Sequence, residues 1–317
     1  MENLNILSCI SSIVVFILLV APGYVVTHKK MLSPTQVDGF SILLVNLIWP
    51  AMIIDAMASV SINKELLHMA LSTAGVSFMV YITSLGISFL RAKVTKMPLN
   101  IAGIYMFAIA FNNTGLIGMP FIKAILGDKA LFIASIVELV NDIFIFSLGI
   151  MLIQPPSAIK KKIDFRFLIS PTFVSVLIGL IIFGFHLQLP TILGNTLSYL
   201  ADATVAISML VIGLQLGEIS IFDLFKEKRA YEVSLCRLVV IPSIIFCILF
   251  LVLKERNLAS TVIVLMYAMP AASCTAIFAR QYKGDYQLAT KFVMLSTIYS
   301  VFTLPVWLML TNYYLSK

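Results

Sequence analysis

Charged residues are scarce in this chain. They make up 12% of its 317 residues, against about 25% in a typical soluble domain. Hydrophobic residues make up 60%, and the mean hydropathy is +1.03. The apolar residues form runs of roughly 20, the length that crosses a bilayer as a helix. This composition excludes a soluble globular domain and predicts a polytopic membrane protein.

Catalytic and metal-binding motifs are also missing. The sequence has no HExxH, no GxSxG and no P-loop, so we expect no enzymatic activity. Its four cysteines are scattered without a CxxC pair and its three histidines lack ligand spacing, so we expect no disulfide framework, metal or cofactor. The net charge of +7 comes without a basic and aromatic patch, which argues against a nucleic-acid partner.

Ten membrane-spanning helices can be drawn along the chain, joined by short loops, which predicts an all-α membrane protein. The loops after the odd-numbered spans hold most of the loop lysines and arginines. The positive-inside rule therefore predicts that these loops are cytoplasmic and that both termini are extracytoplasmic. The predicted spans are 6–26, 38–58, 67–90, 100–125, 130–153, 168–186, 192–217, 232–253, 258–280 and 287–313.

The fourth predicted span contains residues that oppose a continuous helix. Its sequence from Phe111 to Pro120 reads FNNTGLIGMP. Proline lacks an N–H group and clashes with the preceding turn, and glycine weakens a helix. Backbone groups released in the membrane must find other partners, so a broken helix lies against protein or a polar cavity, where transporters bind their substrates. The first half of the predicted substrate site consists of Asn112, Asn113, Thr114, Gly115, Gly118 and Pro120.

The ninth predicted span contains a second such stretch. Proline is followed there by small and hydroxyl residues, and neither stretch contains lysine or arginine. If the two breaks meet at mid-membrane, the N-termini of half-helices would bind an anion such as a carboxylate through N–H groups. The alternative is a pair of kinked helices packed closely through small residues. The second half of the predicted site consists of Pro270, Ala271, Ala272, Ser273, Cys274 and Thr275.

Prolines recur about 150 residues apart. Pro22 in the first span corresponds to Pro171 in the sixth, and Pro120 in the fourth to Pro270 in the ninth. Because five spans is an odd number, a five-plus-five repeat is inverted in the membrane, which is typical of secondary transporters. The predicted repeats are residues 1–153 and 168–317, joined by a cytoplasmic linker at 154–167.

The fifth predicted span carries two carboxylates. Glu138 and Asp142 are four residues apart and share one helix face with Asn141 close by. Charges at mid-membrane are costly and usually functional, so this group predicts coupling to protons or cations. The alternative is a structural pair, neutralised by hydrogen bonds or bonded to Lys291 or Arg237. We place Arg237 near a span end, at the membrane interface.

One amide in the second predicted span has two interpretations. Asn46 lies four residues before Pro50. It either lines the substrate cavity or satisfies the backbone of a helix kinked by the proline. Asn46 therefore joins Glu138, Asn141 and Asp142 as a candidate supporting or coupling residue.

The motifs resemble those of the auxin efflux carrier family, which includes the plant PIN proteins and many bacterial permeases. The stretch Asn112–Pro120 resembles that family's fourth-helix signature, and Ala268-Met269-Pro270 with 278–282 resembles its second crossover. The weaker matches are Pro22-Gly23-Tyr24, 32–36, Asn46 with Pro50, and Gly213-Leu214.

The resemblance covers essentially the whole chain and implies a particular architecture. It implies ten helices in two inverted five-helix repeats, with helices 4 and 9 broken and crossed. It also implies a scaffold domain of helices 1, 2, 6 and 7 and a transport domain of helices 3–5 and 8–10. Carried over, Asn113 and Pro120 match the first crossover motif and Pro270 matches the second.

The sequence departs from the plant members in two places. The linker is short, and Thr275 stands where the plant ninth helix often has a second proline. The resemblance therefore implies a permease for malate-like or malonate-like carboxylates, with an elevator-type movement, rather than an auxin carrier. The alternatives are a cation/proton antiporter and a membrane sensor that does not transport. The expected partners are a small organic anion, a proton or sodium ion, membrane lipid and a second copy of the chain in the cell membrane.

Overall fold

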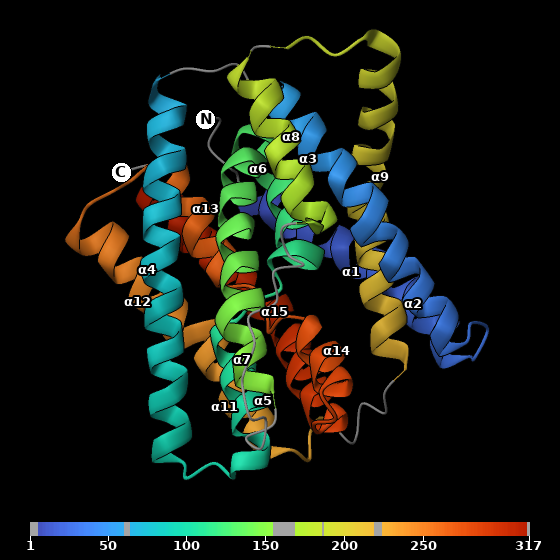
Figure 1. The fold of residues 1–317 in the computed structure, drawn as a ribbon, viewed down its shortest axis with the longest axis vertical. Coiled ribbons are helices and arrows are strands. Elements are labelled where there is room, and N and C mark those ends of the chain that lie inside the picture. The colour runs from blue at the N-terminus through green and yellow to red at the C-terminus, as the bar shows by residue number, and fades with distance from the viewer. Residues whose placement is uncertain (1–5, 60–63, 155–168, 186, 219–223, 316–317) are drawn as a thin grey trace.

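The computed structural model describes residues 6–59, 64–154, 169–185, 187–218 and 224–315, and these segments are helical except at turns and breaks (Figure 1). An isolated antiparallel bridge joins Asn112 to Ala271. Five of the helical segments are wider π-helical turns, labelled η. The elements are α1 (Ile6–His28), α2 (Pro34–Leu43), η1 (Leu44–Ile48), α3 (Trp49–Ser59), α4 (Lys64–Val94), α5 (Leu99–Ala110), η2 (Thr114–Gly118), α6 (Met119–Phe144), η3 (Ile145–Gly149), α7 (Ile150–Ile153), α8 (Pro171–Gly184), α9 (Thr191–Gly217), α11 (Lys228–Leu235), η5 (Cys236–Val240), α12 (Ile241–Phe246), η6 (Cys247–Val252), α13 (Leu258–Tyr267), α14 (Cys274–Gln281) and α15 (Tyr286–Leu315).

Six of the described helical stretches are long and apolar enough to cross a membrane, and four shorter apolar helices accompany them. The prediction of an all-helical membrane protein is confirmed, whereas ten separate spans stay a prediction. Residues 114–153 form one 40-residue stretch, in which Gly127 alone leaves the helix, with φ 76°. The six long stretches are 34–59, 66–94, 114–153, 191–217, 228–252 and 286–314.

Three prolines follow π-helical turns. Pro50, Pro120 and Pro242 each lie two residues beyond the end of η1, η2 or η5. Proline cannot donate to the carbonyl one turn earlier and its ring pushes that carbonyl away, and the wider π turn accommodates both effects. The prolines therefore bend the helices while the chain remains helical through η1 and η5.

Close backbone contacts join α1 to α9. A Cβ atom added to Gly213 would lie 2.0 Å from the carbonyl oxygen of Val20, and one added to Gly23 would lie 2.3 Å from that of Leu210. Gly217 approaches the backbone of α1 one helical turn further on. Small residues four apart allow this approach in membrane helices. Packing of α3 against α8 and α9 extends this group of helices.

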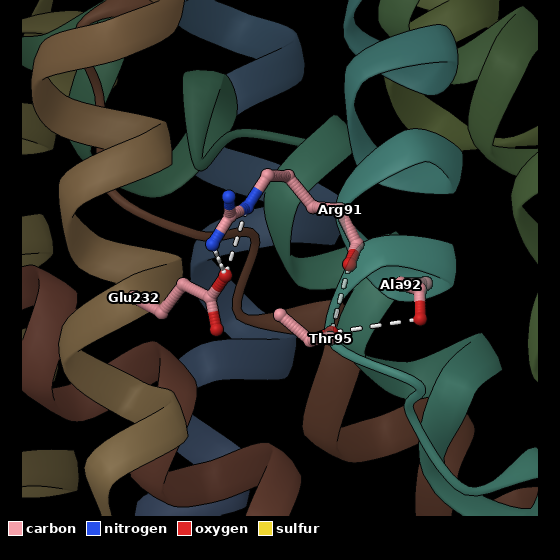
Figure 2. A network of polar contacts seen from close by, with 4 residues as sticks. All are labelled: Arg91, Ala92, Thr95 and Glu232. Carbon is pink, nitrogen blue, oxygen red and sulfur yellow. Dashed lines mark hydrogen bonds and ion pairs between the residues drawn. The ribbon is translucent and has the colours of Figure 1, made fainter.

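A second group contains α4–α7 and α11–α15. Within it, α5 packs against α4, α7 and α15, and α13 packs against α6, α12 and α15. Arg91 on α4 donates from Nε to a carboxylate oxygen of Glu232 on α11 at 2.8 Å, and its Nη2 contacts the same oxygen (Figure 2). The two groups meet where α6 packs against α3, α8 and α9. The linker predicted at 154–167 lies outside the described residues except for Gln154.

Candidate functional site

The first break interrupts the chain between α5 and η2. Helix α5 ends at Ala110, and Phe111 is extended, with φ −107° and ψ 136°. Asn113, with φ −84° and ψ 63°, precedes η2, which begins at Thr114 and continues into α6. The break thus lies at Phe111, Asn112 and Asn113, and Pro120 lies beyond it in the first turn of α6.

The second break covers residues 268–273, between α13 and α14. Pro270 lies inside this break, whereas Pro120 follows the first one. The prolines are therefore not at corresponding places, and the paired residues Asn112 and Ala271 are separated by 159 positions rather than 150. The proline spacing is thus not the spacing of the two breaks.

The two breaks lie against each other through backbone hydrogen bonds. The Asn113 N–H donates to the Pro270 carbonyl at 2.8 Å, and the Ala272 N–H donates to the Phe111 carbonyl at 3.1 Å. These bonds form the isolated bridge at Asn112 and Ala271. Each break thereby satisfies backbone groups that the other helix has released, as the membrane interior requires.

Asn112 joins the first break to the end of α13. Its side chain is 1% exposed, and its Nδ2 donates to the Met266 carbonyl at 2.6 Å. Its Oδ1 lies 2.8 Å from the Tyr81 hydroxyl, which also lies 2.7 Å from Oδ1 of Asn141. Because a hydroxyl carries one hydrogen, Tyr81 donates to one of these amides at a time. Tyr81 was missed in the sequence, where a lone tyrosine in an apolar span gave no signal.

Asn113 and Ser273 stand at the starts of the two following helices. Neither side chain caps its own helix. Instead, Nδ2 of Asn113 donates to Oγ of Ser273 at 2.7 Å. Ser273 and Cys274 are partly exposed, while Thr275 is buried and donates to the Ala272 carbonyl. The helix start at Thr114 is therefore buried, whereas the start at Cys274 is partly exposed.

The predicted coupling residues lie beside the first break. Nδ2 of Asn141 donates to the Thr114 hydroxyl at 2.8 Å and lies 3.5 Å from a carboxylate oxygen of Glu138. Asp142 is 9% exposed and interacts electrostatically with Glu138. The structure therefore brings Glu138, Asn141 and Thr114 into one buried network, with Asp142 one turn away.

Two glycines of the predicted site are contact points. A Cβ atom on Gly115 would lie 2.4 Å from the ring of Trp49 on α3 and 3.0 Å from a carboxylate oxygen of Glu138. A Cβ atom on Gly118 would lie 2.9 Å from the sulfur of Met266. A side chain at Gly115 would collide with α3 and one at Gly118 with α13, so both positions in η2 require glycine.

Asn46 bonds within its own helix rather than to this network. It is exposed, and its Nδ2 donates to the Ile42 carbonyl of its own helix at 2.8 Å. This bond stays within one turn of its own helix, and the role of Asn46 stays a prediction.

Arg237 was placed wrongly at the membrane interface. It is 0% exposed, and its guanidinium donates to backbone carbonyls at the ends of α5 and α13. A second missed residue is Ser296 on α15, whose hydroxyl accepts from the Ala271 N–H at 3.1 Å. Arg237 lies five residues inside the predicted span 232–253, so its position did not distinguish it from an interfacial arginine, and Ser296 resembled any serine in an apolar helix.

A cavity of about 380 Å³ lies elsewhere, between α4 and the α12–η6 segment. Its lining is apolar and contains none of the predicted site residues. The polar cluster at the two breaks, and not this cavity, is the candidate site.

Comparison with known proteins identifies what the chain is similar to. Residues 8–308 match the model of a family described as membrane transport protein. An uncharacterized transporter of Methanothermobacter thermautotrophicus is 32% identical over 204 residues, which are 63% of this chain and 65% of that protein. An uncharacterized transporter of Methanocaldococcus jannaschii is 26% identical over 204 residues, 62% of this chain and 64% of the relative. The chain thus spans less than two thirds of the length of each relative.

Proposed function

The chain belongs to the membrane transport protein family of PIN-like auxin efflux carriers, and from this premise we propose that it carries small organic carboxylate anions, such as malate or malonate, across the cell membrane. It is a multi-pass membrane transporter and not an enzyme. The proposed orientation has both termini outside the cell, as the distribution of basic loop residues predicts.

One observation carries this proposal: two helix starts meet at the bond between Asn113 and Ser273 without capping by either side chain. The first N–H groups of a helix have no carbonyl one full turn earlier and carry partial positive charge. In α14, those of Thr275 and Ala276 donate to the Ala272 and Ser273 carbonyls, which leaves the N–H groups before them. A carboxylate suits such a place. The amides, together with the Thr114 hydroxyl, would orient the anion, and Asn113 and Ser273 would exchange their mutual bond for bonds to it.

Alternating access would follow from movement between the two groups of helices. We propose that α1–α3, α8 and α9 form the scaffold, and that α4–α7 and α11–α15 form the transport domain, in an elevator-type mechanism. The direct backbone contacts between α1 and α9 support a rigid scaffold. Ten spans in two inverted repeats, 1–153 and 168–317, complete this proposal.

The contact between Gly115 and Trp49 tests the movement. We expect Gly115→Val to slow uptake at least tenfold, because its side chain meets Trp49 across the proposed sliding surface. Uptake by proteoliposomes measures this effect, and Trp49→Phe added to the variant should restore part of it. Gly75→Val on α4 is the control, since a Cβ atom there meets nothing within 4 Å. Equal loss in both single variants would contradict a sliding surface at Gly115.

Coupling to protons is proposed for Glu138 and Asp142. Both carboxyl groups are buried one turn apart, and no lysine or arginine among the described residues is within ion-pair distance of either. Two such charges repel strongly in a medium of low dielectric constant. A proton taken up by the pair would compensate the charge of the bound anion.

Single neutralisation tests this coupling. We expect Glu138→Gln and Asp142→Asn each to flatten the pH dependence of uptake, because the protonated form is then imitated at every pH. Uptake measured from pH 5 to 8 provides the profile, and Asp128→Asn, an exposed position on the same helix, is the control. An unchanged profile in both variants would exclude coupling through this pair.

The decisive experiment measures uptake of radiolabelled malate and malonate by proteoliposomes, at two pH values with and without sodium. Accumulation above protein-free vesicles is expected. The buried carboxyl pair also suits a cation/proton antiporter, which would move protons after a sodium pulse and accumulate neither acid. A non-transporting sensor would keep its cellular phenotype in Asn113→Ala and Pro270→Ala variants, whereas a transporter would lose it.

A further inference from the structure

Arg237 is a buried cation that the proposed function does not yet use. It lies in η5, between α11 and α12, and is 0% exposed. A charged side chain inside a protein or membrane is costly unless hydrogen bonds satisfy it. The partners of the guanidinium therefore indicate its role.

All the hydrogen-bond acceptors that the structure gives to this guanidinium are backbone carbonyls beside the two breaks. Nη1 donates to the carbonyls of Ile109 at 3.0 Å and Ala110 at 3.1 Å, at the end of α5. Nη2 donates to Tyr267 at the end of α13, and Nε donates to Met269 at 3.3 Å. One planar side chain thus joins the C-terminal ends of both broken helices.

These C-terminal ends are the negative poles of the crossover. The last carbonyls of a helix lack partners within it and carry partial negative charge. Left uncompensated near the breaks, they would repel an anion that approaches the helix starts at Thr114 and Cys274. The guanidinium satisfies them and adds a full positive charge.

That charge is not neutralised by contact with an acid. Within the described residues, no carboxylate lies at ion-pair distance from Arg237. Arg91, by contrast, is bound to Glu232 (Figure 2). The positive charge of Arg237 therefore remains available to the crossover.

We infer that Arg237 determines the anion selectivity of the crossover: it cancels the negative ends of α5 and α13 and adds a positive charge that offsets the nearby carboxyl groups of Glu138 and Asp142. It is a positioning residue, because it acts through the backbone and its own charge rather than by contact with the anion. This inference rests on the proposed carboxylate transport and predicts a preference for substrates of higher negative charge.

The test compares a dianion, malonate, with a monoanion of similar size, its monoamide, in proteoliposomes at pH 7. The measured quantity is the ratio of kcat/KM for the two substrates. We expect Arg237→Met to lower this ratio about tenfold, mainly through the KM of malonate, because the loss of a nearby charge affects a dianion more. Arg237→Lys should keep the ratio while its kcat falls, because an ammonium group lacks the planar fork that reaches both helices.

Arg91→Met, which removes a charge that is already paired, should leave the ratio unchanged. An equal fall in kcat/KM for both substrates in Arg237→Met, or a changed ratio in Arg237→Lys, would show that Arg237 acts only as a structural cap. Either result would overturn the inference. Should Arg237→Met fail to fold, Arg237→Gln takes its place, because it also removes the charge while keeping hydrogen-bond donors, and the same fall in the ratio is expected. Wild-type protein that moves neither substrate would overturn the proposed function and this inference with it, whereas transport by the wild type with an unaffected ratio in Arg237→Met overturns only the inference.

Discussion

The two breaks in the crossover use different parts of the chain. The first contributes side chains: Asn112 reaches the end of α13, and Asn113 reaches Ser273. The second contributes mainly backbone groups, since the carbonyl of Pro270 and the N–H groups of Ala271 and Ala272 all bond elsewhere. Its alanines have no polar side chain with which to bind.

The side chains around the two breaks also differ. A hydroxyl, an amide and carboxyl groups surround the first break, at Tyr81, Asn141 and Glu138. The second is held by one hydroxyl, that of Ser296, while the guanidinium of Arg237 bonds carbonyls beside both breaks. The first break is therefore suited to recognition and protonation, and the second to holding a backbone frame. Three substitutions test this division.

The largest effect is expected for Asn112→Ala. It removes two buried hydrogen bonds, the short one to the Met266 carbonyl, which keeps a longer bond from the Met269 N–H at 3.4 Å, and the one from Tyr81, so we expect a loss of on the order of 3 kcal/mol in the free energy of unfolding. Denaturation in detergent measures this loss. Asn46→Ala is the matched control, because that amide is exposed and bonds within its own helix. Similar losses in the two variants would show that the first break has no special dependence on its side chains.

A smaller effect is expected for Ser296→Ala at the second break. The variant leaves the buried Ala271 N–H without its acceptor, which costs about 2 kcal/mol. Ser300→Ala, one turn further along α15, removes a buried hydroxyl that bonds only to the Thr297 carbonyl. The midpoint of thermal unfolding should fall more in Ser296→Ala. If Ser296→Ala instead abolishes transport at unchanged stability, the second break takes part in recognition.

The smallest effect is expected for Tyr81→Phe. The ring stays in contact with Phe111 and Phe144, and one hydroxyl is lost, for about 1 kcal/mol. The hydroxyl that links Asn112 and Asn141 is lost. We therefore expect the rate of uptake to fall further than a loss of about 1 kcal/mol in the free energy of unfolding would explain. Tyr267→Phe is the control, since that hydroxyl donates to the Ser77 carbonyl. Equal uptake by the two variants would separate the Tyr81 link from transport.

Much of the fold follows from local chemistry. Apolar runs predict the membrane helices, and the residues around Asn112 and Pro270 predict the interruptions, because amides, glycines and prolines oppose a continuous helix wherever they lie. Boundaries were less predictable: Gly127 alone interrupts the helical stretch where four loop residues were expected. The 150-residue proline spacing was misleading, since a proline bends a helix at one of several positions relative to a break.

The residues that interrupt the two helices were predictable, whereas the contacts between them were not, and their role in binding stays a prediction. Asn113 and Ser273 were expected near an anion, yet their mutual bond depends on how two helices 160 residues apart approach each other. Tyr81 and Ser296 could not be distinguished from other polar residues in apolar spans, because their importance lies in the groups that they meet.

The sequence alone determined a helical membrane protein with two interrupted helices. Both features are local, because the hydrophobicity of a segment and the missing N–H of a proline depend only on the residues of that segment. Only the tertiary structure decided that Asn112 pairs with Ala271 and that Arg237 is buried. A guanidinium is stable away from water only where several hydrogen-bond acceptors converge on it, and here they are carbonyls from the ends of α5 and α13. That convergence belongs to no single segment of the chain.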